Sequence, residues 1–132
     1  MTTAIEYLGN KHKTLINNYC TPDGKYAESS NLIAIDMANL LLNEGKERPQ
    51  IFTIKRWPIF ENGLRRRKAL EPILFSGRVK FRTHQFCICD GIVYDPLLKG
   101  PTSIKKYPIE VFGKGNFIIE KVFSTKRIKE LF

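Results

Sequence analysis

The chain has 132 residues, of which 42% are hydrophobic and 27% are charged, a balance that fits a single globular domain over residues 1–132 and excludes a largely disordered chain. Lys and Arg outnumber Asp and Glu by 22 to 13, and the resulting formal charge of +9 favours anionic partners. We find no secretory signal at the start and no apolar stretch of membrane-spanning length, so we expect a cytoplasmic protein without a membrane span.

Two helices are predicted in the first third of the chain. Apolar residues at mostly helical spacing predict the first over residues 3–18. A strong turn signal follows at Thr21-Pro22-Asp23-Gly24. The second helix is predicted to end near Glu44-Gly45. Its expected apolar face consists of Tyr26, Ser30, Ile33, Met37, Leu40 and Leu41.

Strand patterns dominate the rest of the chain. Residues 50–57 predict a strand that ends at Pro58. We expect the basic segment from there to Leu70 to be a loop or a short helix. A further strand is predicted over residues 116–123, and a short basic helix over residues 125–132. Two helices followed by strands indicate an α+β fold, with a central helix packed on an antiparallel sheet.

The strongest local signal is a β-hairpin. A strand is predicted from Arg78 to Cys89, and its alternation puts Phe81 and His84 on opposite faces. Asp90-Gly91 then forms a two-residue turn before residues 92–96. Pairing across that turn places Asp95 opposite Phe86, and therefore diagonal to His84 on the same face.

A carboxylate beside an imidazole can orient the ring and stabilise its charged form. His84 and Asp95 are therefore candidates for the base and the orienting group of a nucleophilic triad. The same pair is equally compatible with a structural contact that carries no chemistry.

The residues Gly24–Ser30, Thr83–Phe86 and Gly91–Pro96 together resemble the papain-like fold toxins and related transglutaminase-like proteins. In those families a helix opens with a cysteine, and a hairpin carries the histidine before an Asp-Pro step. The likeness covers Cys20 to Phe112. It implies a papain-like or transglutaminase-like core and a cysteine hydrolase or acyl-transfer activity, of peptidase or deamidase type, in a toxin or effector module that acts on a protein substrate. It implies no cofactor.

The resemblance implies a cysteine nucleophile at the start of the second helix, with His84 as general base and Asp95 as its orienting group. Tyr26 occupies the position that aligns with this cysteine. Three alternatives stay open. Cys20 attacks, if the helix begins near Pro22; Ser29 or Ser30 serves instead; or the domain has no nucleophile and binds a protein partner without catalysis.

Three further features are a cysteine pair, a histidine and a basic cluster. Cys87-x-Cys89 lacks a second ligand pair, so we expect buried thiols on the face opposite His84 and no metal site. His12, between two lysines, is expected to be a solvated surface residue. The cluster Arg65-Arg66-Arg67-Lys68 is a candidate contact for an anionic partner, and a basic nucleic-acid-binding domain is the third functional alternative.

Overall fold

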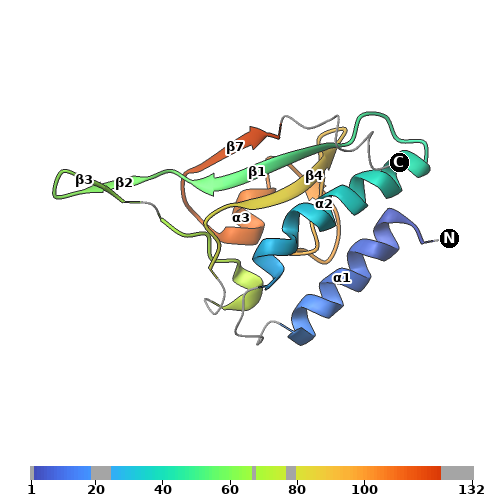
Figure 1. Ribbon diagram of the computed structural model, residues 1–132, viewed down its shortest axis with the longest axis horizontal. Coiled ribbons are helices and arrows are strands. Elements are labelled where there is room, and N and C mark those ends of the chain that lie inside the picture. Colours follow the sequence, from blue (N-terminus) through green and yellow to red (C-terminus); the bar gives the residue numbers. More distant parts are fainter. Residues whose placement is uncertain (1, 19–24, 67, 77–79, 123–132) are drawn as a thin grey trace.

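The computed structural model describes residues 2–18, 25–66, 68–76 and 80–122, and these residues form an α+β fold (Figure 1). The described helices are α1 (Ala4–Asn18), α2 (Lys25–Asn43) and α3 (Tyr107–Phe112), with a short 3-10 helix η1 at Ile73–Phe75. An antiparallel sheet of order β6-β5-β4-β1-β7 consists of β1 (Gln50–Arg56), β4 (His84–Cys89), β5 (Ile92–Tyr94), β6 (Thr102–Ser103) and β7 (Phe117–Lys121). The predicted α+β fold class is confirmed, and so are the predicted strands at β1 and β7, whereas β6 at the other end of the sheet was not predicted.

Helix α2 is the central helix, as predicted, and it packs chiefly against β4. Its end follows the expected glycine signal, since Gly45 has φ 84° and the Lys46 N–H bonds to the Leu41 carbonyl at 3.0 Å. The buried face is rotated from the predicted one, because Ile33 and Leu40 are only half-buried. Among the described side chains of α2, the buried ones are Ser30, Ala34, Met37, Ala38 and Leu41.

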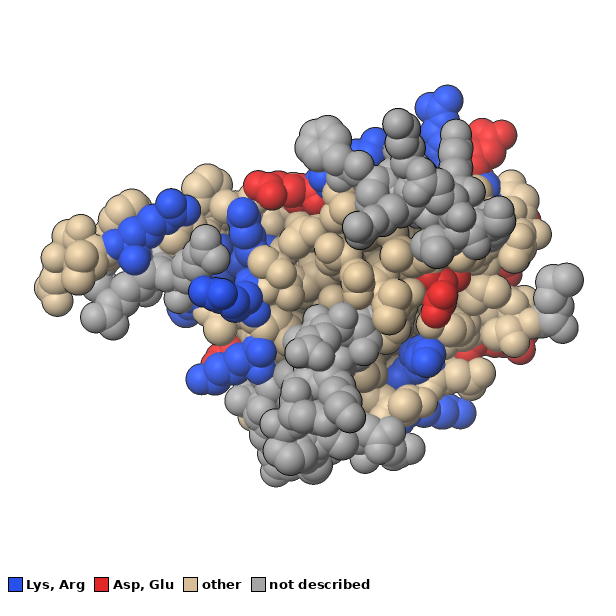
Figure 2. Space-filling view, in the orientation of Figure 1, with Lys and Arg blue, Asp and Glu red and all other residues tan. Residues whose placement is uncertain are grey.

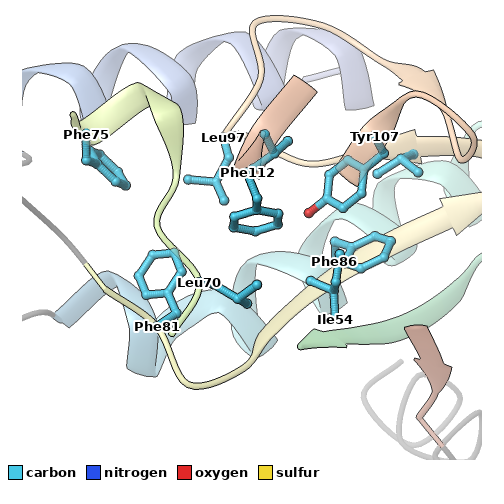
Figure 3. Close-up of a cluster of buried hydrophobic side chains, with 10 residues drawn as sticks. Ile54, Leu70, Phe75, Phe81, Phe86, Leu97, Tyr107 and Phe112 are labelled. Carbon is cyan, nitrogen blue, oxygen red and sulfur yellow. The ribbon is translucent and has the colours of Figure 1, made fainter. Parts of the chain in front are cut away.

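The sheet separates two apolar cores. One lies between the sheet and helices α1 and α2, and contains Cys87 and Cys89 from β4. The other lies on the opposite face, against α3 and η1 (Figure 3). Its buried members are Ile54, Leu70, Phe75, Phe81, Phe86, Val93, Leu97, Tyr107, Val111 and Phe112. Neighbouring residues of β4 therefore belong to different cores, as the alternation of a strand requires.

The β4–β5 hairpin has the predicted register. Asp90 and Gly91 adopt φ 53° and 74°, which is the conformation that the Asp-Gly turn favours. The resulting pairs are Cys89–Ile92, Ile88–Val93 and Cys87–Tyr94. The β5 ladder ends at Tyr94, so Asp95 lies just beyond the sheet.

The predicted start of β4 is wrong. The strand begins at His84, whereas Arg78 and Val79 lie outside the described residues. Phe81 forms a separate bridge with Leu70, and residues 82–83 leave strand geometry. Because this break resets the alternation, Phe81 and His84 lie on the same side and their rings stack at 5.5 Å.

The basic segment after Pro58 is a two-stranded arm rather than a loop or a helix. Strands β2 (Ile59–Glu61) and β3 (Leu64–Arg66) pair with each other and project from the body (Figure 1). The turn between them is Asn62-Gly63, with φ 52° and 75°. Asn-Gly is a strong hairpin signal that was available in the sequence.

The predicted turn at residues 21–24 and the predicted helix at 125–132 lie outside the described residues. Within the described part of the chain, no helix is both long enough and apolar enough to cross a membrane.

Candidate functional site

The hairpin brings His84 and Asp95 into direct contact, as the sequence predicted. His84 is the first residue of β4, and Asp95 follows the last residue of β5. The His84 Nε2 atom lies 2.8 Å from the Asp95 Oδ2 atom. We call this pair the dyad. The register set by the Asp90-Gly91 turn is the local cause of the contact.

The Asp95 carboxylate has two further partners. The Tyr107 hydroxyl of α3 donates a hydrogen bond to Oδ2, and the Leu97 backbone N–H donates to Oδ1 at 3.2 Å. Tyr107 is fully buried. Tyr107 could not be predicted from the sequence, because no local pattern links a helix after β6 to a residue beyond β5. The carboxylate is thus held by three donors from three segments.

The dyad is enclosed by aromatic rings. His84 is 1% exposed and Asp95 is 2% exposed. Phe81 and Phe86 stack roughly parallel to the His84 ring, and Phe112 meets it edge-on at 6.3 Å and 70°. Burial of this kind excludes water and strengthens electrostatic interactions within the cluster.

The hydrogen bonds determine the tautomer of the neutral His84 ring. An ionised carboxylate can only accept, so Nε2 carries the proton that Asp95 binds. In the neutral ring Nδ1 is then the basic nitrogen. A nucleophile activated by this histidine has to approach Nδ1.

Helix α2 mostly covers the face opposite His84, because its core includes Cys87 and Cys89. The helix nevertheless passes the start of β4, since the Gln85 backbone N–H lies 3.5 Å from the Ser30 Oγ atom. Ser30 is buried there. From Ser30, α2 extends back to Lys25. A group on α2 that reaches the dyad therefore has to come from the N-terminal end of the helix.

Of the predicted nucleophiles, the structure describes only the side chain of Ser30. Cys20, the leading candidate, lies outside the described residues. So do the side chains of Tyr26 and Ser29, although their backbone belongs to α2. Ser30 lies beside Gln85, and its Oγ is within acceptor distance of a backbone donor of β4.

Cys87 and Cys89 are buried thiols on the face away from the dyad, as predicted. Burial raises the pKa of Cys87 to about 12, with a smaller contribution from Cys89. Burial also raises the pKa of Cys89. Both thiols are consequently protonated and unreactive near neutral pH. Within the described ranges, no group of three or more His, Cys, Asp or Glu side chains could hold a metal ion.

The prediction for His12 is wrong. This residue is half-buried, and its Nδ1 lies 2.8 Å from the Pro96 carbonyl oxygen. Pro96 directly follows Asp95, so α1 is attached to the loop that presents the dyad. A histidine between two lysines gives no local sign of this contact, because its partner lies 84 residues away along the chain.

The basic cluster lies on the β2–β3 arm and at its base. Arg65 and Lys68 are exposed and line a cavity with Arg82 and Thr83. Arg67 and the side chain of Arg66 lie outside the described residues. His84 does not line this cavity, although Thr83 precedes it in the chain.

Comparison of the chain with protein-family models, curated proteins and solved structures gives no match.

Proposed function

We propose that this chain is a papain-like domain that hydrolyses or transfers acyl groups of a protein substrate, with Cys20 as nucleophile, His84 as general base and Asp95 as the orienting group. The observation that supports it is the 2.8 Å contact between His84 Nε2 and Asp95 Oδ2. This contact leaves Nδ1 as the base of the neutral ring, and three donors fix the carboxylate that orients it.

In this reaction, His84 takes the proton of the Cys20 thiol, and the thiolate attacks the carbonyl carbon of a peptide or side-chain amide. The C–N bond then breaks, and the imidazolium gives its proton to the leaving amine. Water releases the acyl group in hydrolysis or deamidation, and a second amine releases it in transamidation. All three outcomes share the acyl-enzyme step.

A second candidate is a catalytically inactive papain-like domain that binds a protein partner. The burial of His84 and Asp95 favours it, because a catalytic base must meet its substrate, and this pair is 1% and 2% exposed. Tyr26 at the expected nucleophile position favours it as well. Under this second hypothesis, the dyad is a buried polar network that holds β4, β5 and α3 together.

The alkylation rate of each cysteine against pH distinguishes the two candidates. Iodoacetamide is applied to the whole chain and to the His84→Ala variant, and each modified peptide is quantified by mass spectrometry. For the enzyme, we expect Cys20 to react rapidly below the ordinary thiol pKa of about 8.5, and to slow at least 10-fold in the variant. Cys87 is the internal control, because its pKa of about 12 makes it slow throughout.

If Cys20 reacts as an ordinary thiol in both proteins, the cysteine-enzyme proposal is wrong and the inactive domain is favoured. Because His84→Ala removes a buried side chain, its folding is checked by circular dichroism. If Cys87 becomes reactive toward iodoacetamide in His84→Ala, the variant His84→Gln is used instead, because glutamine retains more of the volume and hydrogen-bonding capacity of the histidine side chain.

A further inference from the structure

A basic cleft lies where the β2–β3 arm meets the main sheet. Two cavities of about 120 and 230 Å³ adjoin there, since Arg56, Pro58 and Lys68 line both. None of the described residues lining these cavities is an Asp or a Glu. Figure 2 shows Lys and Arg gathered at the base of the arm. The cationic residues of the basic cleft are Lys55, Arg56, Arg65, Lys68, Arg82 and Lys114.

Most of these cations have no ion-pair partner among the described residues. Lys55 lies 3.7 Å from Glu120, a largely exposed pair of small energetic value. No ion pair with a described residue involves the other five cations of the basic cleft. Four of them are exposed: Arg65, Lys68, Arg82 and Lys114. Like charges gathered without counter-charges attract an anionic ligand.

Arg56 is held in place by the main body of the protein. Its guanidinium donates hydrogen bonds to the Phe112 carbonyl at 3.2 Å and to the Lys114 carbonyl at 3.4 Å. It also lies 4.9 Å from the centre of the Phe117 ring. Because Arg56 lines both cavities, the basic cleft has a preorganised planar cation at its centre.

Two exposed aromatic rings accompany the cations. Trp57 lines the larger cavity and is 55% exposed. Phe60 lies on β2 of the arm and is 74% exposed. A groove of positive charge beside exposed aromatic rings matches the requirements of a single-stranded nucleic acid, whose phosphates alternate with bases that stack.

We propose that the basic cleft binds single-stranded nucleic acid, with the phosphates on its cations and with bases stacked on Trp57 and Phe60. An acidic protein segment would neutralise the cations, but its carboxylates offer no planar ring to cover the two aromatic faces. This function is separate from the proposed acyl transfer, because the dyad and the basic cleft share no residue.

The test uses the single tryptophan of the chain, Trp57. Its fluorescence is titrated with a 12-nucleotide oligothymidylate and, in parallel, with polyglutamate of similar charge. We expect the oligonucleotide to quench the fluorescence and polyglutamate to leave it unchanged. Affinity should fall roughly 20- to 50-fold between 50 and 200 mM salt if three or four phosphates are contacted.

A charge-reversed variant, Arg65→Glu with Arg82→Glu, should bind a labelled oligothymidylate at least 10-fold more weakly in fluorescence anisotropy. The control is Lys13→Glu with Lys46→Glu, which makes the same change in net charge at exposed residues outside the basic cleft and should lose less than about 3-fold. Trp57→Ala should weaken binding about 10-fold through lost stacking. All variants are melted first, to confirm folding.

Three results would overturn the proposal. Equal losses in the charge-reversed variant and its control would show that binding follows net charge alone. Quenching by polyglutamate with equal or greater affinity would assign the basic cleft to an acidic protein segment. Absence of oligonucleotide binding at 50 mM salt would also reject the proposal.

Discussion

The dyad and the basic cleft differ in where their polar and charged side chains lie: those of the dyad are buried, whereas most of those of the basic cleft are exposed. Thr83 lines the basic cleft, and the next residue, His84, is buried in the core. At the dyad, internal donors bind the Asp95 carboxylate, and both side chains are buried away from water. At the basic cleft, most cations are exposed and, apart from Lys55 beside Glu120, they form no ion pair with a described carboxylate. The dyad should therefore govern stability, whereas the basic cleft should govern binding with little effect on stability.

The largest expected effect is on the dyad itself. Asp95→Ala removes the acceptor of the buried His84 N–H and of the Tyr107 hydroxyl, so the free energy of unfolding should fall by about 3–5 kcal/mol. Urea denaturation measures this change. The control is Glu71→Ala, which breaks an exposed pair with Lys80 and should cost less than about 1 kcal/mol. Equal costs would contradict the claim that the dyad stabilises the fold.

Tyr107→Phe tests the third member of the network. This substitution keeps the packing of the ring and removes one donor to the Asp95 carboxylate. A hydrogen bond to a charged group contributes about 1.5–3 kcal/mol, so we expect a loss of that size in urea denaturation. Tyr7→Phe, which removes an exposed bond to Asp36, should cost less. A larger cost for Tyr7→Phe would show that burial is not what makes the Tyr107 bond strong.

Two glycines with nearly the same φ angle, one in the dyad hairpin and one in the arm, allow the stabilities of these two regions to be compared. Gly91 turns the hairpin that presents the dyad, and Gly63 turns the arm, with φ 74° and 75°. Neither would place an added Cβ within 4 Å of other atoms, so alanine acts through backbone strain of about 1–2 kcal/mol.

We expect the full cost of Gly91→Ala to appear in global unfolding. Gly63→Ala should instead loosen the arm locally and weaken oligonucleotide binding, because the arm pairs only with itself. Urea denaturation and anisotropy titration of both variants check this. The same global cost for both would show that the arm and the body unfold as one unit.

The smallest effect concerns alkaline pH. Burial raises the pKa of Cys87 from its ordinary value of 9.0 to about 12. The folded state then holds its proton where the unfolded state has lost it, so this stabilisation is complete below pH 9 and is lost as the pH rises toward 12. We expect a loss on the order of 1 kcal/mol between pH 9 and 10 from this group.

Cys87→Ala should remove that part of the pH dependence, as measured by urea denaturation at pH 8, 9 and 10. An unchanged pH profile in the variant would show that the thiol does not titrate in this way. Tyr94, whose pKa burial also raises, provides the background slope that both proteins share.

Much of this architecture follows from local patterns in the sequence. Helices α1 and α2 follow from helical spacing and a terminal glycine, and the hairpin register follows from Asp90-Gly91, because a two-residue turn determines which residues face each other. That register alone predicted the contact between His84 and Asp95. The arm at Asn62-Gly63 had the same kind of signal.

The features that local sequence patterns did not predict depend on contacts between distant segments of the chain. The bridge between Phe81 and Leu70 interrupts the strand and turns His84 into the aromatic core, which no alternation within residues 78–89 could show. Tyr107 reaches Asp95 from a separate helix, and His12 reaches Pro96 from the first helix. The basic cleft likewise joins side chains from β1, the arm, Arg82 and Lys114. Local patterns set pairing and periodicity, but the docking of one segment on another depends on the packing of the whole core.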